Sequence, residues 1–363
     1  MKVVIAKKLL EEIVSNTSSY LDKKDLSSIT SHLLITAKGG IFSIKATDHE
    51  IGLSYNLQNV AIETEGEATA NGGKLLSVIK GLSDDSVTLE TVNGALFVKQ
   101  KKSKYKLPMF ETRDFPNFPA VEGKNSFDVN AGILGRSLKK IYPSIDTNNP
   151  KYELNGALID VKEGFLNLVG TDTKRLSVYK LITQSKAGEL DTKILIPKKA
   201  IGEIQKLFSD KIKIYYDENV LLAVSENFEF FTKLINGKFP NYERVIPNDT
   251  AYKILIPRDK MVSGVRAINA MCEEMKVTIK KDGMVFESIN EDNSEAKTEI
   301  EAEIEINGEI VFGVKNRFLL DFLSGIESEI FELNFNSSDT AFVLSADGLK
   351  TVVMPINNIK GKL

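Results

Sequence analysis

Residues 163–174 read EGFLNLVGTDTK, and a similar stretch, GGIFSIKATDHE, occupies 39–50. Both alternate apolar and polar residues, which predicts a half-buried strand, and both carry a Thr-Asp pair near the end. DGMVFESINEDN at 282–293 repeats the alternation. Because the pattern occurs three times along one chain, we expect three copies of one structural unit.

The segments around these strands recur as well. AKKLLEEIVSNT (6–17), AGILGRSLKKIY (131–142) and RDKMVSGVRAIN (258–269) place apolar residues three to four positions apart, which predicts amphipathic helices. A second helix is predicted in each unit over 73–82, 198–208 and 315–325, and a β meander follows each one. Asn93-Gly94 and Asp347-Gly348 are residue pairs that tight hairpins prefer.

The chain of 363 residues is therefore interpreted as an α+β protein of three repeated domains. Each domain is expected to contain two helices packed on antiparallel sheets of roughly eight short strands. We place the domains at 1–124, 125–250 and 251–363. The proline-containing segments RDFPNFPAVE (113–122) and GKFPNYERVIP (237–247) are interpreted as the linkers.

Composition excludes several functional classes. The chain is 42% hydrophobic and 27% charged, has no run of about eighteen apolar residues, and carries acids directly after its first apolar stretch. We therefore expect neither a membrane span nor a signal peptide, and a cytoplasmic location. The single Cys272 excludes an internal disulfide, and with only His32 and His49 we expect no metal site and no cofactor.

The predicted helices are much more basic than the chain as a whole. They hold fifteen basic against five acidic residues, a net +10, which leaves −13 for the rest of a chain whose total is −3. One explanation is that helix ends simply favour lysine. The other is a polyanion held through its phosphates without base readout. The candidate DNA-facing helix residues are Lys74, Lys80, Arg136, Lys139, Lys140, Lys198, Lys199, Lys206 and Arg266.

Three interpretations of VGTDTKRLSV (169–178) remain open. A catalytic Asp172 is disfavoured, because no histidine, carboxylate pair or phosphate loop accompanies it, and we expect no catalytic residue. Asp172 would otherwise satisfy backbone amides at a strand end, as its counterpart Asp48 would, with Lys174 and Arg175 solvated. The third interpretation is a wall of a binding pocket.

Four segments carry a family resemblance: LNGALID (154–160), VGTDTKRLSV (169–178), FPNYERVIP (239–247) and TVVMPI (351–356). With the triple repeat and the basic helices, they resemble the bacterial DNA polymerase III beta subunit family of sliding clamps over essentially the whole length. The resemblance implies a head-to-tail homodimer, a ring of six similar domains with helices lining the hole. It also implies a non-enzymatic processivity subunit of the DNA-directed DNA polymerase complex, which encircles double-stranded DNA without sequence preference. A β-rich peptide-binding scaffold that does not encircle DNA is the alternative.

The resemblance further implies a pocket for short peptides. The implied partners are the DNA polymerase III alpha subunit and other polymerases, the clamp loader, and mismatch-repair and initiation-control proteins. Apolar residues would contact the peptide, and an Arg and Lys rim would hold its polar or acidic flank. Carried over position by position, the pocket comprises Leu154, Thr171, Thr173, Lys174, Arg175, Leu176, Pro240, Arg244, Val245, Val352, Met354, Pro355 and Ile356.

Other positions also follow from the resemblance. Lys23, Lys24 and Asn148 match loops where the family contacts DNA, while Tyr105, Leu107 and the helix around Ile268 match its dimer interface. Two departures stand out. The family often has Gly-His where this chain has Thr173-Lys174, which would narrow the pocket floor and make its rim more basic. The tail NNIKGKL (357–363) extends beyond the Met-Pro segment, where it would either cover the pocket mouth or fray.

Overall fold

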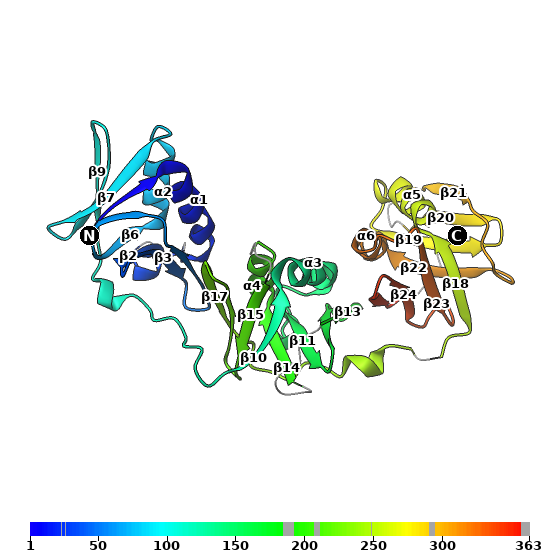
Figure 1. Ribbon diagram of the computed structural model, residues 1–363. Helices are drawn as coiled ribbons and strands as arrows, with labels where there is room; N and C mark the ends of the chain where they lie inside the picture. Colours follow the sequence, from blue (N-terminus) through cyan, green and yellow to red (C-terminus); the bar gives the residue numbers. More distant parts are fainter. Residues whose placement is uncertain are drawn as a thin grey trace. The chain divides into compact units, whose positions relative to one another are not determined.

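The computed structural model describes residues 1–22, 24–25, 27–183, 192–206, 211–247, 249–289 and 295–356. Within these residues the elements follow one another in the same order in each repeat, except that the first repeat has one additional strand, β5 (Ala61–Thr64), between its two helices (Figure 1). The first repeat consists of β1 (Lys2–Ala6), α1 (Lys7–Thr17), β2 (His32–Lys38), β3 (Ile41–Thr47), β4 (Ile51–Leu57), β5 (Ala61–Thr64), β6 (Gly66–Asn71), α2 (Gly72–Lys80), β7 (Ser86–Val92), β8 (Ala95–Gln100) and β9 (Ser103–Pro108).

The second and third repeats follow the same plan. The second consists of β10 (Asn125–Asn130), α3 (Ala131–Ile141), β11 (Gly156–Lys162), β12 (Phe165–Thr171), β13 (Arg175–Ile182), β14 (Thr192–Pro197), α4 (Lys198–Ile204), β15 (Lys211–Tyr216), β16 (Val220–Val224) and β17 (Phe228–Lys233). The third consists of β18 (Tyr252–Pro257), α5 (Arg258–Asn269), β19 (Glu274–Lys280), β20 (Gly283–Ser288), β21 (Lys297–Glu301), β22 (Ile310–Lys315), α6 (Asn316–Gly325), β23 (Ile330–Phe335), β24 (Phe342–Ala346) and β25 (Leu349–Val353). The predicted triple α+β repeat is confirmed, and every predicted helix is present, although α4 ends at Ile204, before the end of the predicted range 198–208.

Local chemistry accounts for several element boundaries. The side-chain oxygens of Asn71 and Asn130 accept backbone N–H groups at the starts of α2 and α3, at 3.0 and 2.9 Å, as helix N-caps do. Asn93-Gly94 and Asp347-Gly348 all have positive φ, between 49° and 78°. A two-residue hairpin turn with both residues in this region matches the twist of its strands, so both predicted hairpins are confirmed.

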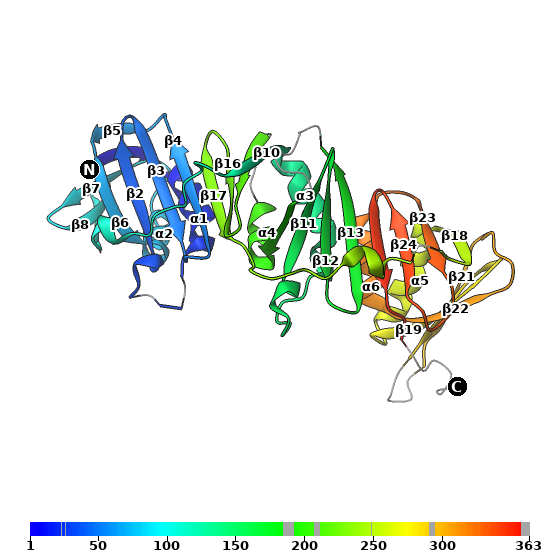
Figure 2. The same cartoon turned by 90° about the horizontal axis from the view of Figure 1, so that it is seen from below.

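The described residues divide into two compact units, which do not coincide with the repeats. The first unit comprises residues 1–129 and 211–234. Its described strands form a five-stranded sheet, β5-β1-β7-β8-β9, and an eight-stranded sheet, β10-β15-β16-β17-β4-β3-β2-β6 (Figure 2). The larger sheet joins the first and second repeats because β4 pairs with β17. Helices α1 and α2 pack against each other, and α1 also packs on β3 and β4.

The second unit comprises residues 130–210 and 235–363. Its described strands form an eight-stranded sheet, β14-β11-β12-β13-β25-β24-β23-β18, and a four-stranded sheet, β21-β20-β19-β22. Here β13 of the second repeat pairs antiparallel with β25 of the third, just as β4 pairs with β17 in the first unit. Contiguous sheets therefore cross both repeat boundaries, and this continuity fixes the positions of residues from different repeats.

Neither a membrane-spanning helix nor a metal-binding group appears in the part of the chain that the structure describes. No helix there is long and apolar enough to cross a membrane. No group of three or more His, Cys, Asp or Glu side chains there is arranged to hold a metal ion.

Candidate functional site

The loop between β12 and β13 makes the same hydrogen bonds as the loop between β3 and β4. Asp172 Oδ1 accepts the backbone N–H groups of Lys174 and Arg175 at 3.0 and 2.9 Å. Asp48 Oδ1 accepts those of the two equivalent residues at 3.0 Å each. In each loop the threonine hydroxyl donates to the carbonyl four residues later, at 2.7 Å. The prediction that Asp172 satisfies backbone amides is confirmed.

The residue after the aspartate in this loop adopts a left-handed backbone. His49 and Thr173 both have φ of 72°. This conformation suits glycine and is unfavourable for a β-branched residue. Thr173 is exposed in this loop, and the expectation that it narrows the pocket floor stays a prediction.

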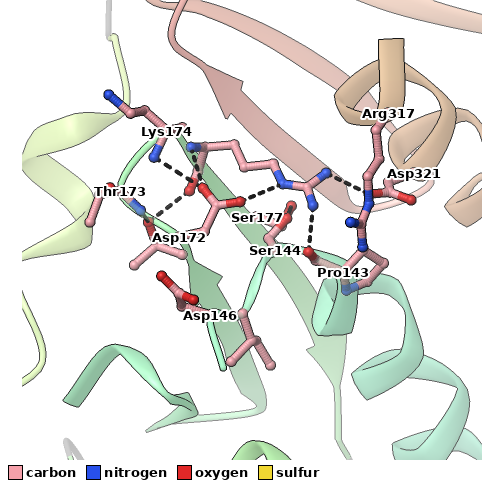
Figure 3. A network of polar contacts seen from close by, with 12 residues as sticks. Pro143, Ser144, Asp146, Asp172, Thr173, Lys174, Ser177, Arg317 and Asp321 are labelled. Carbon is pink, nitrogen blue, oxygen red and sulfur yellow. Dashed lines mark hydrogen bonds and ion pairs between the residues drawn. The ribbon is translucent and has the colours of Figure 1, made fainter. Parts of the chain in front are cut away.

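Arg175 is where the two loops differ. The equivalent residue is Ile51, and both side chains are buried. The Arg175 guanidinium donates from Nε to Asp172 Oδ2 at 3.0 Å and from Nη1 to Asp321 Oδ2 at 2.7 Å, and Nη2 donates to the Pro143 carbonyl (Figure 3). Its side chain is only 3% exposed. The expectation of a solvated rim cation is therefore wrong for Arg175, because its donors are directed into the protein.

An aromatic ring and a chain of hydroxyls complete the surroundings of Arg175. Its Cζ lies 4.5 Å from the ring centroid of Phe318 on α6, which is a cation–π distance. The buried hydroxyl of Ser177 lies 2.7 Å from that of Ser144 and 3.0 Å from that of Thr351. These contacts connect β13 to the 3₁₀ turn that follows α3 (Tyr142–Ser144), to β25 and to α6, so that two repeats meet around one side chain.

The predicted pocket residues from distant segments are brought together by the β13–β25 pairing. Leu176 lies opposite Val352, and the backbone N–H of Met354 donates to the Lys174 carbonyl at 2.9 Å. Leu154, Leu176 and Val352 belong to one buried hydrophobic cluster. Pro355 is also buried, while Thr171 and Ile356 are half-buried. Leu154, Leu176 and Val352 therefore supply an apolar base.

Other residues of the predicted pocket are exposed. Met354 is 46% exposed and Val245 is 50% exposed, unusually high for apolar residues. Lys174, Pro240 and Arg244 are exposed as well. With Arg175 buried, Lys174 and Arg244 are the cations among the predicted rim residues. Adaptable apolar side chains beside exposed cations can bind a short peptide that has an apolar end and an acidic flank.

A buried hydrogen bond anchors the wall that carries Arg244 and Val245. These residues lie in the 3₁₀ turn η6 (Tyr242–Val245), and Tyr242 is buried in the same hydrophobic cluster. The Tyr242 hydroxyl donates to Asp160 Oδ2 at 2.7 Å and accepts from Asn167 Nδ2 at 3.0 Å. Burial, and next the bond to Asp160, raise the pKa of Tyr242 far above its usual range. Sequence analysis missed this anchor, although FPNYERVIP and LNGALID contain both partners.

Most of the predicted DNA-facing helix residues point to solvent. Lys74, Lys80, Arg136, Lys139, Lys199 and Arg266 are exposed. Lys206 is exposed but pairs with Glu203 at 2.8 Å, and Lys140 is half-buried with its Nζ 4.9 Å from the centroid of the Tyr179 ring. Exposed cations on α2, α3, α4 and α5 support the phosphate-binding interpretation of the helix charge.

Lys198 does not fit that interpretation. Its Nζ donates to the Ile145 carbonyl at 2.6 Å and to Thr147 Oγ1 at 3.2 Å, and it lies over the Tyr142 ring. Burial, followed by the nearby charge of Arg317, lowers the pKa of Lys198 below its usual value. The structure thus gives Lys198 a role in holding the 145–147 loop.

The predicted DNA-contacting loops are only partly described. Lys24 and Asn148 are exposed. The loop around Asn148 is fixed by Asn149, which bonds to Asp146 at 2.9 Å and to Asn155 at 2.7 Å. Lys23 and the tail 357–363 lie outside the described residues.

The predicted interface residues differ in exposure. Tyr105 is 38% exposed on β9, an edge strand of its sheet. Leu107 is mostly buried but lines a surface cavity of ≈ 610 Å³ together with Lys74 and Val78. Ile268 is only 1% exposed, so its prediction as a contact residue is wrong. Met271, two residues after α5, is 52% exposed.

Known proteins of one family match this chain over nearly its whole length. Residues 1–119, 128–241 and 243–357 match the models of the N-terminal, central and C-terminal domains of the DNA polymerase III beta subunit. The beta sliding clamp of Helicobacter pylori strain J99 is 35% identical over 350 residues, which cover 95% of this chain and 94% of that protein. The Rickettsia bellii beta sliding clamp is 26% identical over 357 residues, 93% of each chain.

Solved structures of beta clamps have the same fold as this chain. The Helicobacter pylori beta clamp bound to a DNA ligase peptide superposes with a TM-score of 0.93 at 34% identity, covering 98% of this chain and 100% of that one. The Pseudomonas aeruginosa DNA polymerase III beta subunit has the same fold, with a TM-score of 0.91 at 24% identity.

The repeated domains, the exposed basic helices and the apolar site beside β25 define a DNA sliding clamp, a protein that tethers partners to DNA. The chain belongs to the DNA polymerase III beta subunit family. The alternative of a scaffold that does not encircle DNA is not favoured, since relatives that match along the whole chain are sliding clamps.

Proposed function

We propose that two copies of this chain close head to tail into a ring around double-stranded DNA, each contributing domains at 1–124, 125–250 and 251–363. The observation that carries the proposal is the set of exposed cations on equivalent helices of all three repeats: Lys74, Lys80, Arg136, Lys139, Lys199 and Arg266. Phosphate contacts of this kind carry no sequence information. Topological linkage then retains the ring on DNA, while weak contacts let it slide.

The site formed by β13, η6 and the segment after β25 is proposed as the peptide pocket. Support comes from its exposed apolar residues and from the ligase peptide bound by the Helicobacter pylori clamp. The DNA polymerase III alpha subunit, other polymerases, the clamp loader, and repair and initiation-control proteins would share this pocket. The protein would act in the cytoplasm as a processivity subunit without a catalytic site of its own.

A loading experiment tests the ring. After a clamp loader places the protein on nicked circular duplex DNA, gel filtration should recover the two together, and linearisation of the DNA should release the protein. Neutralising Lys74, Lys139 and Lys199 together should reduce loading, with loss of salt sensitivity. Equal retention on circular and linear DNA would rule out topological linkage.

A further inference from the structure

We propose that Arg175 and Asp321 form an ion pair that positions the peptide pocket without touching the peptide. The inference rests on the proposed pocket and adds Asp321, on the third-repeat helix α6, to the residues on which peptide affinity depends. Arg175 is thus a positioning residue. We call its ion pair with Asp321 the brace, because it joins β13 of the second repeat to α6 of the third.

The first step is that all three guanidinium nitrogens already donate within the protein, and that the side chain is too buried to meet a peptide carboxylate. Nε, Nη1 and Nη2 each donate to a separate acceptor, on Asp172, Asp321 and Pro143 respectively. The face of the guanidinium lies over Phe318, and the side chain is 3% exposed. Only an arginine has the planar set of donors that can reach three acceptors in different directions.

The second step is that the loop itself does not need the arginine. The equivalent loop of the first repeat keeps the same aspartate and threonine bonds with Ile51 in this position. Asp172 Oδ1 and the Thr171 hydroxyl shape the loop, and the other carboxylate oxygen, Asp172 Oδ2, is left to hold Arg175. The additional function of Arg175 is therefore to fasten an already formed loop to α6.

The third step connects this brace to the exposed apolar residue of the pocket. The Lys174 carbonyl, one residue before Arg175, accepts the backbone N–H of Met354. Leu176, one residue after, pairs with Val352. Any movement of the loop relative to α6 is thus transmitted to the segment that carries Met354. Loss of the brace should therefore leave the pocket residues in less well-defined positions.

The test uses Asp321→Asn in the full-length protein, which removes the charge on α6 and leaves every predicted pocket residue unchanged. Fluorescence anisotropy with the ligase peptide of the Helicobacter pylori clamp should show affinity weaker by about three- to tenfold. Arg317→Ala is the matched control. Arg317 is the second arginine that pairs with Asp321, through Nε at 3.5 Å from Oδ2, and its side chain is 77% exposed. Its removal should leave peptide affinity within about twofold of the wild type.

Hydrogen exchange provides a readout that general destabilisation would not reproduce. In Asp321→Asn, exchange should accelerate in peptides that cover 171–176 and 352–356, while the equivalent loop at 47–52 serves as an internal reference and should not change. Phe318→Leu removes the ring beneath the guanidinium but keeps an apolar side chain. This variant should also accelerate hydrogen exchange in the same peptides.

The outcomes separate this inference from the pocket itself. Met354→Ala could weaken peptide binding while Asp321→Asn changes neither peptide affinity nor local hydrogen exchange. That result would refute the proposed role of the ion pair and leave the proposed pocket supported. If Met354→Ala also leaves affinity unchanged, the proposed pocket is wrong. Uniformly faster exchange over the whole chain in Asp321→Asn would contradict a positioning role.

Discussion

Position 175 shows how a repeated fold acquires a local site. The second repeat has a buried arginine where the first has buried Ile51, and the next residue is Leu176 where the first has Gly52. A Cβ at Gly52 would lie 2.3 Å from Phe231, so no side chain fits there. Phe118 packs on the same Phe231 ring. Aromatic rings thus fill the space beside Gly52, where β4 pairs with β17. Leu176, where β13 pairs with β25, instead belongs to a buried apolar cluster.

Tyr242→Phe tests the hydrogen bond beneath η6. The change leaves Asp160, only 1% exposed, without the hydroxyl that donates to it, and should lower the free energy of unfolding by about 1–3 kcal/mol. The raised pKa of Tyr242 also predicts a pH effect. Its neutral form is favoured in the folded state, so this contribution is complete below about pH 10 and is lost as pH rises above it.

Denaturant unfolding between pH 8 and pH 11 measures both effects. The wild type should lose more stability than Tyr242→Phe over the alkaline part of this range. Tyr252→Phe, at a tyrosine that is 39% exposed on β18, is the control and should follow the wild type. Parallel curves for the wild type and Tyr242→Phe would contradict the assigned hydrogen bond.

Packing at the element scale depends on small residues where helices meet sheets. Gly264, in the middle of α5, faces Phe286 on β20, and a Cβ there would lie 2.0 Å from the ring. Phe286 is fully buried, so the ring cannot move aside without disturbing the core. The helix therefore approaches the four-stranded sheet only because position 264 has no side chain.

Gly264→Ala should lower the free energy of unfolding by about 1–3 kcal/mol, because overpacking outweighs the gain in helix propensity. Gly202→Ala in α4 is the matched control. Its nearest neighbour is the Tyr142 hydroxyl at 4.0 Å, so alanine should raise stability there by up to about 1 kcal/mol. Thermal unfolding of the two variants should therefore shift in opposite directions, and a shared direction would refute the packing argument.

Closure into a ring belongs to the scale of the whole molecule. β9 is an edge strand in the described part of its sheet, with Tyr105 exposed, and an edge of this kind offers unpaired backbone groups to a second chain. At the other predicted surface Met271 is exposed while Ile268 is not. In the proposed ring, a head-to-tail contact between these two surfaces would close after two copies.

Met271→Lys should weaken the dimer at least about tenfold, because a charge would replace an apolar contact residue, and should leave thermal stability of the chain unchanged. Sedimentation at micromolar concentration measures this as a shift toward the 40.3 kDa species. Ile330→Lys alters an equally exposed apolar residue outside the predicted interface and should not shift the distribution. A persistent Met271→Lys dimer would place the interface elsewhere.

The candidate site was only partly predictable. The sequence motifs identified the loop and the role of Asp172, because a short polar side chain beside a strand end bonds to amides within three residues of it. They did not identify how Arg175 is used, because its partners Pro143 and Asp321 lie 32 and 146 residues away. Local pattern cannot specify a contact over such separations, nor the burial that makes Ile268 a core residue.

By itself the sequence determined the triple repeat, the six helices, the hairpin turns and the excess of positive charge on the helices, since each depends on periodicity or on the chemistry of adjacent residues. Tertiary structure decided the rest. It buried Arg175 against α6, tied Tyr242 to Asp160 across 82 residues, and gathered pocket residues from segments centred near 154, 175, 243 and 354. The physical reason is that β13 pairs with β25 across a repeat boundary, and only the folded sheet brings those side chains within contact distance.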